Sequence, residues 1–94
     1  MATMIVRHTV RDFASWKSIF DQHAATRKAA GSQGGQLFQA AGNPNDVTIM
    51  FHWDTLDNAR KFSESPDLKS TMEKAGVTGP PQIQFLQNEA KLEV

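Results

Sequence analysis

Three histidines, at positions 8, 23 and 52, carry the side chains best suited to proton transfer. An imidazole can accept or donate a proton because its reference pKa lies near neutrality. His8 falls on the apolar face of a predicted strand and His23 on the apolar stripe of a predicted helix. Both are therefore candidate catalytic residues. His52 is adjacent to Trp53, so it points to the opposite strand face, towards an interface rather than a pocket.

Each candidate also has a simpler interpretation. His8 could be a neutral core histidine hydrogen-bonded to the backbone, and His23 could lie at the edge of the core. Metal binding has little support, because no two histidines stand four apart on a helix and no glutamate-containing zinc motif is present. The chain has no cysteine, which excludes a disulfide framework and a thiol nucleophile. We expect no metal.

An aromatic-rich apolar set accompanies the histidines. Most of it is expected in the core, since burying such a side chain contributes about 1.5–3 kcal/mol. A few members could line a pocket for a planar, apolar ligand. Arg27 could neutralise an anionic ligand at the mouth of that pocket, or lie at an exposed helix end. The candidate ligand-binding residues are Trp16, Phe20, Arg27, Phe51, Trp53, Phe62 and Met72.

The first half of the chain predicts a strand, a helix and a hairpin. Residues 3–10 alternate in polarity, with His8 on the more apolar face. Apolar residues recur three and four apart over 13–30, which predicts one long helix that begins after Asp12 and ends at Gly31. Residues 32–35 are expected to form a loop. A second strand is expected over 35–41, a hairpin loop over 42–46 and a central strand over 47–53, buried on both faces.

The second half predicts two short helices and a last strand. Asp54 or Thr55 should cap the first helix, and Ser65-Pro66-Asp67 should begin the second, which ends at Gly76. Gly79-Pro80-Pro81 predicts an extended connection before a strand over 83–87. The pattern does not place the tail, residues 88–94.

Length and charge exclude several classes of function. The 94 residues form one domain, and ten basic residues balance ten acidic ones. The chain therefore lacks the electrostatic footprint of a nucleic-acid or anionic-membrane partner. No signal peptide or membrane span is apparent, so a cytoplasmic location is expected.

The order of elements predicts an α+β, ferredoxin-like βαββαβ fold. Its four-stranded antiparallel sheet would carry the helices on one face and leave the other face bare. Because that bare face still carries apolar residues, a second copy is expected to cover it, and the pattern predicts a homodimer.

Several segments resemble the dimeric α+β barrel superfamily, which includes antibiotic-biosynthesis monooxygenase-like proteins and haem-degrading monooxygenases. The segments are Val6–His8, Trp16, Phe20–His23, Val47–Trp53 and Phe62–Leu68, and the resemblance extends over nearly the whole chain. Within the superfamily the chain is most similar to short, uncharacterised, cyclase-like bacterial proteins. The resemblance implies a pocket between the sheet and the helices.

Three departures narrow what the resemblance implies. Met72 stands where the haem-degrading relatives carry a histidine iron ligand, and the first strand has Arg7 and His8 instead of their asparagine. Trp53 matches the tryptophan of quinol-oxidising relatives, but their tyrosine has no counterpart because the chain has no tyrosine. No tightly bound cofactor is therefore expected.

Two functions remain as hypotheses. The first is a monooxygenase or cyclase/isomerase that acts on an aromatic or polyketide-like molecule, with His8 and His23 holding or moving protons. The second is a non-catalytic, dimeric ligand-binding or stress-associated module. An enzyme needs a solvent-connected cavity that contains a polar group, whereas a binding or structural dimer can fill that space with side chains.

Overall fold

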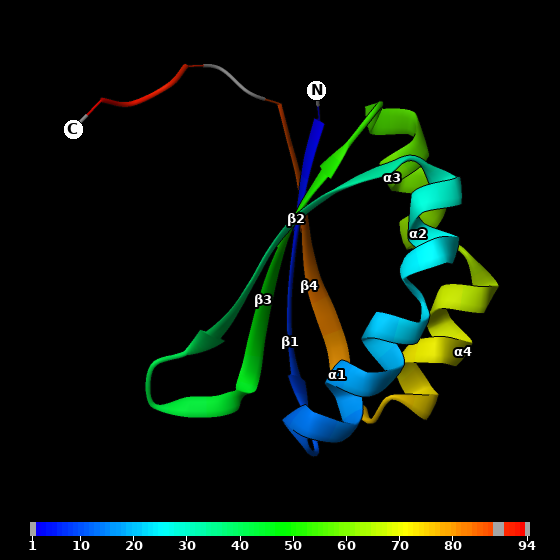
Figure 1. Ribbon diagram of the computed structural model, residues 1–94, viewed down its shortest axis with the longest axis vertical. Helices are drawn as coiled ribbons and strands as arrows, with labels where there is room; N and C mark the ends of the chain where they lie inside the picture. Colours follow the sequence, from blue (N-terminus) through cyan, green and yellow to red (C-terminus); the bar gives the residue numbers. More distant parts are fainter. Residues whose placement is uncertain (1, 88–89, 94) are drawn as a thin grey trace.

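The computed structural model describes residues 2–87 and 90–93 and shows a four-stranded antiparallel sheet with its helices on one face (Figure 1). The elements are β1 (Ala2–Val10), α1 (Phe13–Gln22), α2 (Ala24–Ala30), β2 (Ser32–Ala40), β3 (Asn43–Trp53), α3 (Leu56–Ser63), α4 (Pro66–Lys74) and β4 (Val77–Gln87). The strand order is β2-β3-β1-β4. This arrangement confirms the predicted α+β, ferredoxin-like fold.

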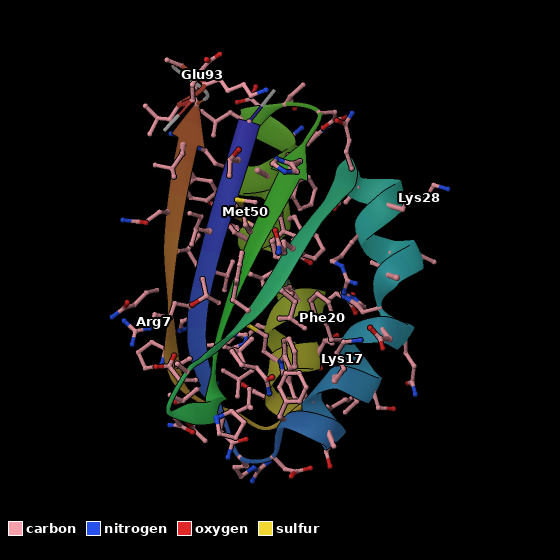
Figure 2. The ribbon with its side chains drawn as sticks, turned by 60° about the vertical axis from the view of Figure 1, so that its left-hand side comes forward. Arg7, Lys17, Phe20, Lys28, Met50 and Glu93 are labelled. Atoms are coloured by element: carbon pink, nitrogen blue, oxygen red, sulfur yellow. The ribbon has the colours of Figure 1, made fainter. Side chains whose placement is uncertain are left out.

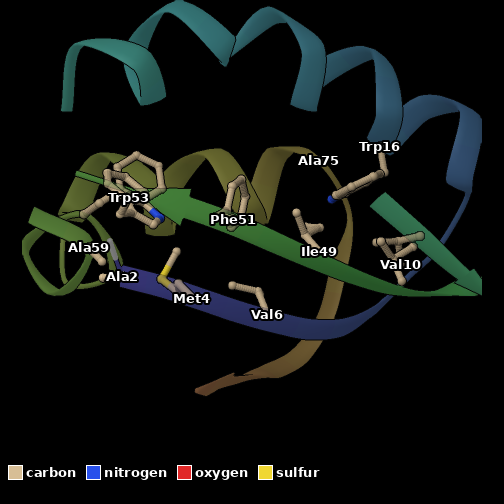
Figure 3. Close-up of a cluster of buried hydrophobic side chains, with 12 residues drawn as sticks. Ala2, Met4, Val6, Val10, Trp16, Ile49, Phe51, Trp53, Ala59 and Ala75 are labelled. Atoms are coloured by element: carbon tan, nitrogen blue, oxygen red, sulfur yellow. The ribbon is translucent and has the colours of Figure 1, made fainter. Parts of the chain in front are cut away.

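β1 lies in the middle of the sheet and sets its inner face. It pairs with β3 and β4 in a register that places Met4 beside both Phe51 and Phe85. The strand alternates as predicted, so His8 faces the helices while Arg7 faces away from them. Figure 3 shows the side chains of β1 and β3 gathered on this inner side.

The core fills the space between the sheet and the helices. Trp53, Met4 and Val47 are its largest fully buried side chains. The other buried apolar residues are Ala2, Val6, Val10, Trp16, Ile49, Phe51, Ala59, Phe62 and Ala75.

The long helix predicted over residues 13–30 is wrong in one respect, because it breaks at His23 into α1 and α2. The His23 N–H is shared between the carbonyls of Ile19 and Phe20. The Phe20 carbonyl also accepts a hydrogen bond from the Arg27 guanidinium at 2.7 Å. This side-chain bond lies at the break, where the apolar periodicity of the sequence continues. Both predicted ends, Asp12 and Gly31, are confirmed.

The hairpin is longer than the sequence predicted. Residues 32–35 were expected to form a loop, but they belong to β2, whose register with β3 shifts between Ser32 and Gly35. The expected loop over 42–46 is also wrong, since β3 begins at Asn43. Turn-forming residues are compatible with strands near a bulge or a strand end, which local composition does not reveal.

The two short helices follow the predicted caps. Thr55 accepts from the Asn58 N–H, and Ser65 accepts from the Leu68 N–H ahead of Pro66. The predicted connection at 79–81 lies inside β4, where the register with β1 shifts opposite His8.

β3 is buried on its inner face and half-buried on its outer face in this chain. The predicted burial of both faces is thus only partly reached. Within the described residues, every helix is too short or too polar to cross a bilayer. Of the tail, residues 90–93 have no regular secondary structure, and residues 88–89 and 94 lie outside the described residues.

Candidate active site

A cavity of about 60 Å³ lies between the inner face of the sheet and the helices. That volume accommodates a few water molecules and is smaller than the roughly 150 Å³ of an apolar cavity that takes up benzene. Its lining residues are Met4, Val6, His8, Trp16, Phe20, His23, Arg27, Ile49, Phe51, Ser63, Leu68, Thr71, Met72, Ala75 and Ile83. Of the nine predicted site residues, only Trp53 and Phe62 are not in this lining.

His8 is the buried polar group of this cavity. Its side chain comes from β1, is only 7% exposed and meets the Trp16 ring edge-on at 5.5 Å. Neither ring nitrogen has a hydrogen-bond partner among the described residues. Burial lowers the pKa of the His8 imidazole, which favours the neutral form.

The two unpartnered nitrogens of His8 favour a polar ligand or water in the cavity, and they share their lack of a described partner with His52 Nδ1 and Trp53 Nε1 outside it. A buried polar atom without a partner costs about 1–3 kcal/mol, so native proteins usually satisfy such atoms. The alternative of a core histidine bonded to the backbone does not describe His8 in this structure. A neutral imidazole offers one donor and one acceptor, which are the groups needed to bind or deprotonate a hydroxyl group.

His23 lies at the break between α1 and α2 and also lines the cavity. Its Nε2 is 3.2 Å from the Asp67 carboxylate in the first turn of α4. This contact holds the ring in place and joins the first helical segment to the last. Asp67 was not predicted as a site residue, because its place at the start of a helix was already accounted for by the helix dipole. Only the fold brings residues 44 positions apart together.

Three aromatic rings form one wall of the cavity. Trp16 stacks on Phe20 with centroids 4.8 Å apart, and Phe20 lies 6.2 Å from Phe51. Figure 3 shows Trp16 reaching from α1 towards the sheet, where Phe51 stands on β3. The wall is therefore aromatic and apolar, which suits an apolar ring in the ligand.

Arg27 closes this wall on the side of α2. Its guanidinium lies 3.8 Å from the centre of the Phe20 ring. Burial lowers the pKa of Arg27, and the nearby Asp21 carboxylate opposes that shift. Asp21, however, is bonded to Lys17 through both carboxylate oxygens. Arg27 thus makes no ion pair among the described residues.

The opposite wall is formed by α4 and β4. Ser63, Met72 and Ile83 separate the cavity from a larger hollow between these two elements. Ser63 and Thr71 also line the cavity but were not predicted, since single hydroxyl residues on a helix give no distinctive sequence pattern.

Trp53 and Phe62 lie behind the cavity, in the core. Their rings are 5.1 Å apart, and Trp53 is fully buried. No group of three His, Cys, Asp or Glu side chains within the described residues is arranged to hold a metal ion.

Comparison with solved structures identifies the fold. A protein assigned as an antibiotic biosynthesis monooxygenase from Bordetella bronchiseptica superposes with a TM-score of 0.79 and 22% identity, covering 95% of this chain and 97% of that one. SnoaB, a cofactor-independent oxygenase from Streptomyces nogalater, gives 0.78 and 20%, covering 99% and 97%. A further such monooxygenase structure, from Caulobacter crescentus, gives 0.73 and 17%, covering 95% and 90%.

No protein-family model and no curated protein matches the sequence. The structural similarity extends over nearly the whole chain at low sequence identity, so it establishes architecture rather than reaction. The chain therefore has the fold of the antibiotic biosynthesis monooxygenase structures, which is the α+β fold that its sequence resemblance predicted.

Proposed function

We propose that this protein is a small-molecule enzyme whose His8 removes a proton from an acidic phenol or enol held in the cavity. The observation that carries the proposal is His8 itself, a buried imidazole with both nitrogens free in an aromatic-walled cavity. The shared fold with a protein described as a cofactor-independent oxygenase supports the same class of chemistry.

The geometry suits a proton acceptor. The lowered pKa keeps the imidazole neutral at pH 7, so its lone pair is available. Proton transfer produces an imidazolium beside an enolate, and the attraction between these charges offsets the desolvation that disfavours the imidazolium. An oxygenase would then add dioxygen, turning a ring CH₂ into C=O and releasing one water. A cyclase or isomerase would return the proton to a different carbon.

The other lining residues have supporting roles in this proposal. His23, held by Asp67, hydrogen-bonds the substrate or carries the proton onward. Trp16, Phe20 and Phe51 hold the planar ring, and Met72 limits the space towards α4. No metal or tightly bound cofactor takes part, and the expected cytoplasmic location remains a prediction.

Hydrogen–deuterium exchange into a surrogate substrate tests the proton-transfer step directly. The probe is 2-tetralone, an enolisable ketone fused to one aromatic ring, followed by proton NMR in deuterated buffer. Wild-type protein should accelerate loss of the ring-adjacent CH₂ signal by about 10²-fold or more over buffer. His8→Asn should remove this acceleration, whereas His52→Asn, a change on the outer face of the sheet, should keep it.

Two results would overturn the proposal. If wild-type protein binds 2-tetralone but exchange equals the buffer rate, the non-catalytic ligand-binding module becomes the better account. If His8→Asn exchanges as fast as wild type, another base acts.

We also propose that a second copy of this chain covers the outer face of the sheet. That face contains a hollow of about 710 Å³, lined by Thr3, Ile5, Met50, His52, Leu86, Gln87, Ala90 and Lys91. Leu86 is 43% exposed there. On the same face Arg7 and Asp46 form an ion pair at 2.9 Å. Two copies can therefore approach through this face without burying an unpaired charge of either residue.

A further inference from the structure

A second hollow adjoins the cavity on the side of α1 and β2. It has a volume of about 260 Å³, is more open to solvent and is lined by more polar groups, including Lys17, Ser32 and Gln36. The two spaces share one wall, formed by Phe20, Arg27, Ile49 and Phe51. We call the two spaces the inner cavity and the outer hollow.

We propose that the ligand spans both spaces, with an aromatic ring in the inner cavity and a single negative charge, a carboxylate, bound by Arg27 at the shared wall. The inference rests on the proposed function for the position of the ring. It adds the substrate class, which is an aromatic carboxylate.

Size is the first argument. The inner cavity, of about 60 Å³, is smaller than the roughly 150 Å³ of a cavity that takes up benzene, so an aromatic ligand that enters it has to extend into a neighbouring space. Two larger hollows adjoin it, and the one on the side of α1 and β2, the outer hollow, shares the wall that contains Arg27. Figure 2 shows Phe20, which lines both spaces, between α1 and the strands.

The unused donors of Arg27 are the second argument. A guanidinium carries five N–H donors, and the described hydrogen bond of Arg27 uses one nitrogen, Nη1, which donates to the Phe20 carbonyl. The ring of Phe20 supports the guanidinium plane at 3.8 Å and fixes its orientation. A half-buried, pre-oriented guanidinium without an ion-pair partner among the described residues is suited to a bidentate carboxylate.

The neighbouring charges limit the ligand to one negative charge. Lys17 and Asp21 also line the outer hollow, but they neutralise each other at 2.7 Å. Arg27 is then the cation of this wall whose charge is not balanced by an ion pair within the described part of the chain. A phosphate or a dicarboxylate would bring a second negative charge that no unpaired cation of this wall balances within the described residues.

Tryptophan fluorescence provides the test, because Trp16 lines the inner cavity and stacks on Phe20. The probes are 2-naphthoate and its neutral amide, 2-naphthamide, which differ in charge but hardly in shape. Wild-type protein should bind the carboxylate about tenfold to hundredfold more tightly than the amide, as expected for hydrogen bonds to a charged group. Arg27→Gln should remove that preference.

Lys28→Gln is the matched control, since Lys28 lies on the same helix and points away from the sheet (Figure 2). It removes one positive charge without touching either space, so the preference for naphthoate should remain. If Arg27→Gln and Lys28→Gln lose the preference for naphthoate to the same degree, the effect is one of overall charge, and the proposed carboxylate site at Arg27 is overturned.

Three further outcomes would contradict the proposal. Wild-type protein could bind both probes equally, Arg27→Gln could weaken both probes to the same degree, or neither probe could change Trp16 fluorescence. The exchange of neutral 2-tetralone by wild-type protein is a separate measurement. Failure of proton transfer therefore remains distinguishable from failure of carboxylate recognition.

Discussion

His8 meets the ring of Trp16 edge-on, with the centroids 5.5 Å apart and the planes at 76°. This contact fixes the imidazole in the cavity without satisfying either of its nitrogens. Aromatic packing thus supplies the position of the histidine, and its hydrogen-bonding capacity is left for a ligand. This arrangement lowers the stability of the folded chain, which leads to the first prediction.

Replacing His8 by Leu should stabilise the protein by about 1–2 kcal/mol at pH 7, because an apolar side chain removes the buried, unpartnered nitrogens. The free energy of unfolding is measured by urea denaturation. His8→Asn, which keeps a polar group in the cavity, should not stabilise the protein. Equal stability of His8→Leu and wild type would mean that the nitrogens are satisfied in solution.

The stability of the wild-type protein should fall as the pH drops below about 6.5, the ordinary pKa of an unfolded histidine. Burial lowers the pKa of His8 in the folded state, so the unfolded chain takes up a proton that the folded chain resists. The loss occurs between the ordinary imidazole pKa and the lowered one, and His8→Leu should reduce it. Denaturation at several pH values from mildly acidic to mildly basic measures the effect, and an unchanged slope in His8→Leu would contradict it.

Asp67→Ala should slow 2-tetralone exchange by about tenfold, because His23 loses the carboxylate that positions its ring. Asp57→Ala is the control, since Asp57 occupies the first turn of α3 as Asp67 does in α4. Both changes should alter stability by roughly 0.3–1 kcal/mol through the helix dipole. Asp67→Glu should restore part of the rate, and equal rates in the two alanine variants would exclude a positioning role.

Substitution of each tryptophan in turn should distinguish an effect on ligand binding from an effect on stability. Trp16→Phe should abolish most of the fluorescence change on naphthoate binding, because Trp16 lines the cavity. Trp53→Phe should keep that change but lose about 1–3 kcal/mol of stability, since Trp53 is fully buried behind the cavity. A fluorescence change that follows Trp53 would place the ligand elsewhere.

Leu86→Glu should yield monomers if a second copy covers the outer face of the sheet, because a carboxylate would be buried at the interface. Light scattering coupled to size-exclusion chromatography measures the mass. Leu92→Glu is the control, since Leu92 is 86% exposed in the tail. Monomeric wild-type protein at micromolar concentration would refute the dimer.

The sequence predicted the fold well because its signals are local. Alternation along β1, the caps at Asp12, Thr55 and Ser65, and the stop at Gly31 each depend on a few neighbouring residues. The errors arose where distant groups decide the backbone. The break at His23 coincides with the bond from Arg27 to the Phe20 carbonyl, which apolar periodicity cannot show.

The candidate site was only partly accessible to the same reasoning. Strand and helix periodicity placed His8, Trp16 and Phe20 on the interior faces of their elements, and all three line the cavity; their roles there stay predictions. The contact between Asp67 and His23 and the stacking of Arg27 on Phe20 each depend on how separate elements pack. The sequence alone therefore did not predict these contacts.

The most direct test of the central claim is the pH dependence of 2-tetralone exchange in wild type and His8→Asn. If His8 is the base, the wild-type rate rises as its imidazole loses a proton, at a pH below the ordinary value for histidine, and levels off near neutrality. The variant should lack this rise. The same pH profile in both proteins would contradict the assignment of His8 as the proton acceptor.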